Sequence, residues 1–306
     1  MGADSGVLTA ERLSVGRDGR PLITGIELEL RRGEVVVVLG PNGVGKSTLL
    51  ATLAGLLAPV AGVVRRRGRV AAALQAPALA RRTAQQNVEA ALQWWGVPRA
   101  ERPVRAERAL DTLGVAHLAG RPATELSGGE ARRVHLARGL ALEADALLLD
   151  EPFAGLDAPT RAELLQDVSS AVRSPDRATL LVVHERAEAW ALADRMLVLL
   201  DGAVAATGTP AEVLERPPTI EVATFLGFSG RLHDGNGTVH CLRPAHVAFD
   251  ADGPLTGVLV KKIPEEDAVL CEVAIGDDRV QTRAPYPGPA PGEQVRLRID
   301  GGVTFP

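Results

Sequence analysis

A glycine-rich loop follows a short apolar run near the start of the chain. The run Val35 to Leu39 is continuously apolar and rich in β-branched residues, a pattern typical of a strand buried on both faces of a parallel sheet. The loop GPNGVGKST comes directly after it, and residues 46–55 have the composition of a helix. A strand, a glycine-rich turn and a helix in this order predict an α/β fold that presents backbone N–H groups to a phosphate.

Each residue type in this loop has a chemical role in the pattern G-x-x-x-x-G-K-[ST]. The glycines allow backbone N–H groups to wrap phosphates, Lys46 places a cation on the β- and γ-phosphates, and Ser47 offers a hydroxyl to Mg²⁺. The alternative is a glycine-rich turn without a ligand, but the flanking strand and helix favour a nucleotide site. The residues predicted to bind the nucleotide are Gly40, Pro41, Asn42, Gly43, Val44, Gly45, Lys46, Ser47 and Thr48.

Two further apolar runs end in polar residues. Ala146 to Leu149 leads into Asp150, and Thr179 to Val183 leads into His184. Both runs are expected to be buried parallel strands, whose carboxyl ends meet at the edge where α/β sheets bind ligands. We therefore expect Asp150 at the Mg²⁺ ion and His184 at the γ-phosphate, the alternative for His184 being an ordinary surface or core histidine.

Glu151 follows Asp150 at the tip of the predicted strand. A carboxylate in this place is the natural general base for a water that attacks the γ-phosphate. The alternative is a helix start, with Asp150 as N-cap and Glu151 in the first turn. Pro152 and Phe153 make that helix start a poor one.

Composition limits the possible classes of protein. The chain has 306 residues, 46% of them hydrophobic, which allows one large or two ordinary domains with packed cores. The formal charge of −4 gives no basic field for nucleic acid. Cys241 and Cys271 lie far apart, which argues against a disulfide framework or a zinc site and fits a reducing cytoplasm. No apolar window is long enough to span a membrane, so work at a membrane would require partners.

The pattern of apolar and polar residues changes along the chain. Residues 87–114 have helical spacing interrupted at Pro98 and Pro103, which indicates a mainly helical insert. From about Leu232, short alternating runs separated by Gly, Pro and Asp indicate a small β-barrel-like domain, with Cys271 as a buried hydrophobe.

A second glycine pair occurs in TELSGGEARR, residues 124–133, just before an arginine-rich amphipathic run. With LSGGE, the phosphate loop and LLLDEP in this order, residues 8–225 resemble the ATP-binding subunit of an ABC transporter: a P-loop NTPase with a RecA-like core and a helical subdomain. The resemblance implies an ATP hydrolase that pairs head to tail, with Ser127, Gly128 and Gly129 closing over the ATP of the partner copy. Asp157 would belong to the loop that crosses this interface.

The same resemblance assigns two more residues. Gln75 would contact Mg²⁺ and the attacking water, and the segment after it would face the membrane subunits. Arg17 stands where the family usually has an aromatic residue against adenine, and an arginine plane can also stack on a base. Glu130 stands where glutamine is commoner in the family and can still cap the following helix.

The C-terminal residues 232–306 resemble the TOBE (transport-associated OB-like) domain of importers, most clearly at Leu242-Arg243-Pro244 and His246-Val247. The two resemblances imply an ATPase domain over 1–228, with a helical subdomain at about 76–140, and a β domain over 232–306. They further imply a homodimer or paired cassette at the cytoplasmic face of the bacterial membrane, two transmembrane permease subunits and an extracytoplasmic solute-binding protein, with no nucleic acid.

Other nucleotide-binding classes fit less well. A GTPase would require an Asn-Lys-x-Asp base reader, which the three lysines, Lys46, Lys261 and Lys262, do not supply. Small-molecule kinases have no use for LSGGE, and chromosome ATPases need a long coiled coil before it. A soluble ABC ATPase acting on ribosomes or nucleic acid and an exporter cassette remain open alternatives.

Overall fold

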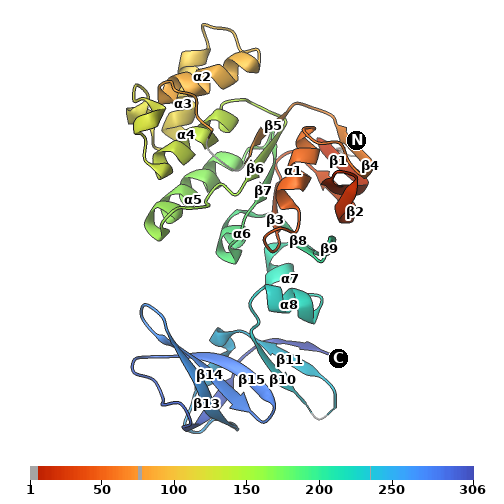
Figure 1. Ribbon diagram of the computed structural model, residues 1–306, viewed down its shortest axis with the longest axis vertical. Coiled ribbons are helices and arrows are strands. Elements are labelled where there is room, and N and C mark those ends of the chain that lie inside the picture. The colour runs from red at the N-terminus through yellow and green to blue at the C-terminus, as the bar shows by residue number, and fades with distance from the viewer. Residues whose placement is uncertain (1–5, 75–77, 235) are drawn as a thin grey trace. The chain divides into compact units, whose positions relative to one another are not determined.

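The computed structural model describes residues 6–74, 78–234 and 236–306 and divides into two compact units, Met1–Pro210 and Ala211–Pro306 (Figure 1). The sequence predicts a boundary at about Leu232, where helical periodicity gives way to alternating runs. In the structure, residues 211–231 already belong to the second compact unit. The predicted α/β cassette followed by an all-β region is confirmed as the fold class.

A six-stranded sheet forms the centre of the first unit. Its strands, in spatial order, are β5 (Val70–Ala73), β6 (Ala146–Asp150), β7 (Ala178–Val182), β3 (Val35–Leu39), β8 (Arg195–Leu200) and β9 (Ala203–Gly208). All neighbours are parallel except β8 and β9. The predicted buried strands are confirmed: β3 has the expected bounds, β6 includes Asp150, and β7 ends at Val182, two residues before His184.

A smaller antiparallel sheet covers one face of this core. It consists of β2 (Arg20–Leu30), β1 (Leu8–Arg17) and β4 (Ala61–Arg66). Helix α1 (Lys46–Ala54) contributes Leu49, Leu50 and Leu53 to the hydrophobic core between the two sheets. Val36 and Val38 of β3 face the same core, so packing fixes both the strand before the phosphate loop and the helix after it.

The predicted helical insert is confirmed. Helices α2 (Ala84–Trp94) and α3 (Arg102–Thr112) pack with α4 (Gly128–Leu140), as Figure 1 shows. Pro98 lies between α2 and α3, and Pro103 occupies the first turn of α3, where its missing N–H has no cost. The other helices of this unit are α5 (Ala158–Val172) and α6 (Arg186–Leu192), with 3₁₀ turns at Ala116–Leu118 and Ala123–Glu125.

The second unit begins with two short helices, α7 (Pro210–Glu215), whose first residue still belongs to the first unit, and α8 (Ile220–Phe225), and continues as an antiparallel sheet. Alternate residues such as Val269, Cys271 and Val273 are buried, which confirms the predicted alternation and the buried role of Cys271. The strands, in spatial order, are β12 (Val247–Phe249), β16 (Gln294–Ile299), β13 (Leu255–Pro264), β14 (Val269–Ile275), β15 (Asp278–Ala284), β10 (Gly230–His233), β11 (Val239–Leu242) and β17 (Val303–Phe305), with a 3₁₀ turn at Pro244–His246.

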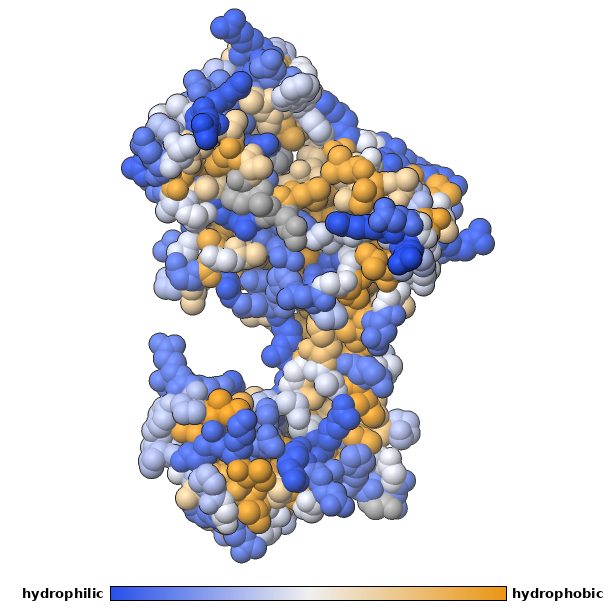
Figure 2. Space-filling view, in the orientation of Figure 1, coloured by the Kyte–Doolittle hydropathy of each residue, from blue (hydrophilic) through white to orange (hydrophobic). Residues whose placement is uncertain are grey.

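The surface mixes polar and apolar residues. On the face drawn in Figure 2, apolar patches lie between hydrophilic ones on each unit. Among the described residues, no helix is long and apolar enough to cross a membrane.

Candidate active site

The phosphate loop joins β3 to α1. Gly45 precedes the first residue of α1 and has a φ of 112°, a conformation that L side chains rarely adopt. A Cβ atom at this position would also lie 3.2 Å from the side chain of Ile23. The glycine therefore allows the loop to turn tightly into the helix, whose first N–H groups have no partner within the helix and suit an anion.

Lys46 is folded back onto the loop that carries it. Its Nζ atom donates to the carbonyl oxygens of Gly40 at 2.7 Å and Pro41 at 3.0 Å, and the residue is buried. Burial lowers the pKa of Lys46, while the carboxylates of Glu151 and Asp150 oppose that shift. The ammonium is thus held beside the loop and close to two acidic groups.

Asp150 and Ser47 form an oxygen pair beneath the loop. Asp150 is buried at the end of β6, and burial raises its pKa, while a hydrogen bond from the Ser47 side chain opposes this. The Oδ1 atom of Asp150 has no hydrogen-bond partner among the described residues. A buried carboxylate oxygen in need of a partner, beside a hydroxyl, is a donor set that suits Mg²⁺.

Glu151 and His184 meet across the ends of two adjacent strands. The Nε2 atom of His184 lies 2.6 Å from Oε1 of Glu151. Glu151 has a φ of 50°, in the left-handed region, and its N–H donates to the carbonyl of Val182 at 3.0 Å. This strained backbone directs the side chain off the strand tip.

Lys46, Ser47, Glu151 and His184 line one cavity of about 520 Å³, whereas Asp150 is not part of its lining. Its lining brings together most of the predicted nucleotide residues, the predicted base and the predicted γ-phosphate contact. The lining residues are Arg17, Leu22, Asn42, Gly43, Gly45, Lys46, Ser47, Thr48, Glu151 and His184. Gly40, Pro41 and Val44 belong to the loop but do not line the cavity.

The glycine-pair motif lies elsewhere. Ser127 caps α4 in a capping box with Glu130: the Glu130 N–H donates to Ser127 Oγ at 3.3 Å, and the Ser127 N–H donates to Glu130 Oε2 at 2.7 Å. The predicted capping role of Glu130 is thereby confirmed. Gly128 and Gly129 form the first turn of this helix. None of these residues lines the cavity of the phosphate loop.

Asp157 caps α5, accepting from the Thr160 N–H at 2.9 Å, and does not line the cavity either. Its predicted place at a dimer interface stays a prediction. Gln75, predicted at the Mg²⁺ ion and the attacking water, lies outside the described residues.

Two residues of the site were not predicted. Leu22 lines the cavity, and the Asp18-Gly19 turn between two apolar runs was a hairpin signal that would have placed it on the same face as Arg17. Arg132 of α4 donates from Nη2 to the carbonyl of Ala154 at 3.1 Å, which ties α4 to the loop after Glu151. The arginine-rich run after LSGGE was the only sign of it in the sequence.

Known proteins that resemble this chain bind ATP, in agreement with the nucleotide-binding geometry of the cavity. The family model described as "ABC transporter" matches residues 23–154. An aliphatic sulfonates import ATP-binding protein of Streptomyces avermitilis is 44% identical over 75% of this chain and 86% of its own length. An Fe(3+) ions import ATP-binding protein of the same organism is 34% identical over 96% of both chains.

A solved structure gives the same result for the fold and the family. The cbiO1 protein from Clostridium perfringens, described as part of the ABC transporter complex cbiONQ, matches with a TM-score of 0.61 and 28% identity. The match covers 69% of this chain and 92% of that one. The chain described here belongs to the ABC transporter family, as an ATP-binding subunit that hydrolyses ATP.

Proposed function

We propose that this chain powers an importer as a head-to-tail dimer that binds two ATP molecules with Mg²⁺ between its copies. It would act at the cytoplasmic face of the membrane, on two permease subunits that receive cargo from an extracytoplasmic solute-binding protein. The relatives described above are import proteins by name, and one of them aligns through the β unit as well as the ATPase unit. The resemblance of residues 232–306 to a TOBE domain supports the same direction of transport.

The proposal of a dimer rests on one observation: the residues predicted to contact ATP lie in two separate places on the chain. Lys46, Glu151 and His184 line the nucleotide cavity, whereas Ser127 and Gly129 start a different helix and do not line it. A serine hydroxyl and the free N–H groups of a helix start are suitable donors to a phosphate. A second copy, placed head to tail, would supply those donors to the γ-phosphate.

Hydrolysis in this site follows from its side chains. Glu151 accepts a proton from the attacking water, and His184, within hydrogen-bond distance of Glu151, orients the carboxylate and reaches the γ-phosphate. Lys46 stabilises the charge of the transferred phosphoryl group. Ser47 and Asp150 would hold Mg²⁺, which when bound neutralises charge on the β- and γ-phosphates.

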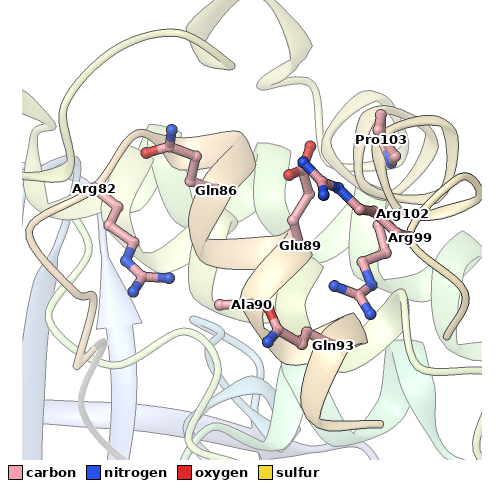
Figure 3. Close-up of a pocket in the computed structure, with 8 residues that line it drawn as sticks. All are labelled: Arg82, Gln86, Glu89, Ala90, Gln93, Arg99, Arg102 and Pro103. Atoms are coloured by element: carbon pink, nitrogen blue, oxygen red, sulfur yellow. The ribbon is translucent and has the colours of Figure 1, made fainter. Parts of the chain in front are cut away.

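A groove on the helical part of the first unit suits a contact with the permease subunits. It has a volume of about 650 Å³ and is shown in Figure 3. Gln86, Glu89, Ala90 and Gln93 of α2 form its floor, while Arg82, Arg99, Arg102 and Pro103 surround it. The only carboxylate of the lining, Glu89, accepts from Gln85 Nε2 at 2.8 Å. Three arginines against one glutamate favour an acidic segment of the partner.

The test is isolation of the subunit from native membranes after mild cross-linking. We expect two different membrane proteins and a solute-binding protein in one complex with it. The Arg99→Glu/Arg102→Glu variant should lose the membrane proteins while still hydrolysing ATP, because both residues lie outside the nucleotide cavity. Recovery with ribosomes alone, and with no membrane protein, would contradict the proposal and favour a soluble ABC ATPase.

A further inference from the structure

Arg177 lies in the turn that joins α5 to β7, and its side chain is partly buried. The Nη2 atom donates to the carbonyl of Ala171, in the last turn of α5, at 2.6 Å. The Nε atom is enclosed without a hydrogen-bond partner, and Nη1 has none among the described residues. A guanidinium group presents a fixed fork of N–H donors, so one carbonyl satisfies only part of it.

The acidic residues around Arg177 do not neutralise its charge. Two hollows border Arg177, and their linings contain the carboxylates of Glu143, Asp145 and Asp176. Glu143 binds an arginine of α3 at 2.8 Å, and Asp145 binds Arg32. In the described part of the chain, Arg177 forms no ion pair, and burial lowers its pKa without an opposing charge. Arginines that leave the solvent are nearly always paired, so this one is in need of an anion.

One of the two hollows has an excess of positive charge. It is a cavity of about 180 Å³ between α3 and the C-terminal ends of α4 and α5, and both α3 and α5 pack on α4 (Figure 1). Its lining contains three arginines, Arg105, Arg108 and Arg177, and a single carboxylate, that of Glu143. Arg105 is bound by Glu143 and by Glu101. The side chain of Arg108, like that of Arg177, has no ion pair with a described residue.

We propose that this cavity binds a small tetrahedral oxyanion, inorganic phosphate or sulfate, between Arg108 and Arg177. The planar guanidinium group matches the oxygens of such an anion with parallel N–H donors. A water molecule occupies about 30 Å³ in the liquid, so an anion with four oxygen atoms needs roughly 120 Å³. The cavity offers about 180 Å³. Ligands the size of a nucleotide need about 300 Å³ or more, so the volume favours the free anion.

The cavity is separate from the nucleotide site. Arg177 precedes the first residue of β7, whereas His184 lies two residues beyond the last. A strand of five residues spans about 16 Å, so the two cavities lie at opposite edges of the sheet. They have no lining residue in common. The anion would contact α3 of the helical insert and the turn before β7 together, and would stabilise the first unit without occupying the phosphate loop.

The test is thermal unfolding of the full, nucleotide-free chain in sodium phosphate or sodium sulfate, compared with sodium chloride of equal ionic strength. Binding should raise the melting temperature by about 3–6 °C when the anion reaches about ten times its Kd, and this gain should saturate. Both anions also stabilise proteins by exclusion from the surface, but that effect does not saturate. A wild-type protein without a saturating gain would overturn the inference.

Variants locate the binding site within the chain. Arg177→Gln and the more exposed Arg108→Gln should each lose at least about half of the saturating gain, because each removes one of the two unpaired guanidinium groups. Arg20→Gln is the matched control: it removes an exposed arginine that does not line the cavity, and it should keep the gain. Lys46→Ala should keep it too. A gain that Lys46→Ala loses and Arg177→Gln keeps would place the anion at the phosphate loop and refute the inference. Because no ATP is used, the result is independent of the proposed function.

Two further arms test the charge and the size of the cavity. Glu143→Gln removes the single carboxylate of the lining, so the midpoint of the anion titration should move to about 2- to 5-fold lower concentration. An unchanged or higher midpoint would contradict a site held by charge. Glycerol phosphate carries the same oxygens on a larger molecule and should give no saturating gain at concentrations where phosphate does. A gain equal to that of phosphate would show that the cavity takes the phosphate group of a larger ligand, against the assignment of a free anion.

Discussion

His184 Nε2 lies 2.6 Å from Glu151 Oε1, within the cavity of the phosphate loop. The two residues follow adjacent parallel strands, so the sheet itself sets their separation. The contact restricts the carboxylate to one orientation beside Lys46 and Ser47. If Glu151 is the base, as we propose, this contact holds it ready for a water that sits in line with the γ-phosphate.

Glu151→Gln should lower ATP turnover at least about 100-fold, because an amide cannot accept the proton of the attacking water. ATP binding should persist and trap a closed dimer, seen as an ATP-dependent shift in size-exclusion chromatography. His184→Ala should lower kcat about 10- to 100-fold with little change in nucleotide affinity, since the base is still present but not oriented. Near-wild-type turnover by Glu151→Gln would refute the assignment of the base.

The proposed head-to-tail dimer predicts complementation between two inactive variants. Lys46→Ala loses nucleotide binding at its own loop, and Ser127→Arg blocks the site of its partner copy. A mixture of the two should regain ATPase activity, because each heterodimer contains one complete site. A mixture of Lys46→Ala with Glu151→Gln is the control and should stay inactive, since both changes damage the same half of the site. Equal activity in the two mixtures would contradict the head-to-tail arrangement.

Asp150, the proposed ligand of Mg²⁺, is expected to lower the stability of the nucleotide-free protein. Burial raises the pKa of this carboxyl above its ordinary 3.8. When the folded chain raises the pKa of an acid, the ionised form is less stable in the folded chain than in the unfolded one. The stability of the protein therefore falls as the pH rises through the ordinary pKa and the raised pKa. Asp150→Asn should therefore raise the melting temperature of the nucleotide-free protein at neutral pH.

The same variant should lose Mg²⁺-dependent hydrolysis, because an amide is a poor ligand for Mg²⁺. Asp157→Asn is the matched control, as an exposed N-cap that asparagine fills equally well, and should leave the melting temperature nearly unchanged. A lower melting temperature for Asp150→Asn would show that the Ser47 contact and the charge of Lys46 outweigh the burial of the carboxylate.

The sequence predicted those parts of the fold that local pattern determines. Strand β3 is apolar throughout, and β6 and β7 are apolar except for Asp150 and Thr179, because both faces of these strands are covered. Such apolar runs are easily recognised in a sequence. Leu22 was not predicted because its place depends on how the β1–β2 hairpin lies over Gly45, a tertiary contact. Arg132 was missed for the same reason: its carbonyl partner at Ala154 is 22 residues away. The sequence did not assign helices α7 and α8 to the second unit, because composition gives no sharp boundary between the two units.

Glu130 should tolerate glutamine. The capping box needs only a side-chain acceptor for the Ser127 N–H, and glutamine supplies one. The Arg121 contact at 3.4 Å would be weakened, but an exposed pair of this kind contributes little. We expect Glu130→Gln to keep most of its ATPase activity, whereas Glu130→Ala should lose about 1 kcal/mol of stability. Loss of turnover in Glu130→Gln with an unchanged melting temperature would indicate a direct role at the nucleotide.

His135 should make the first unit sensitive to acid. It is buried in α4, and burial lowers its pKa from 6.5 to about 4, with the charges of Arg138 and Arg132 acting in the same direction. The unfolded chain therefore binds a proton below about pH 6.5 that the folded chain refuses until about pH 4. Stability contributed by the neutral ring is complete above pH 6.5 and is lost as the pH falls towards 4, at up to about 1.4 kcal/mol per pH unit.

The variant His135→Leu lacks the group that binds this proton. The urea concentration at its unfolding midpoint should therefore fall less steeply with falling pH than that of the wild type over this interval. Urea unfolding followed by circular dichroism between pH 8 and 4 measures both slopes, and the pH 8 values give the packing effect of the substitution alone. Parallel slopes for the two proteins would mean that the folded chain does not lower the pKa of His135.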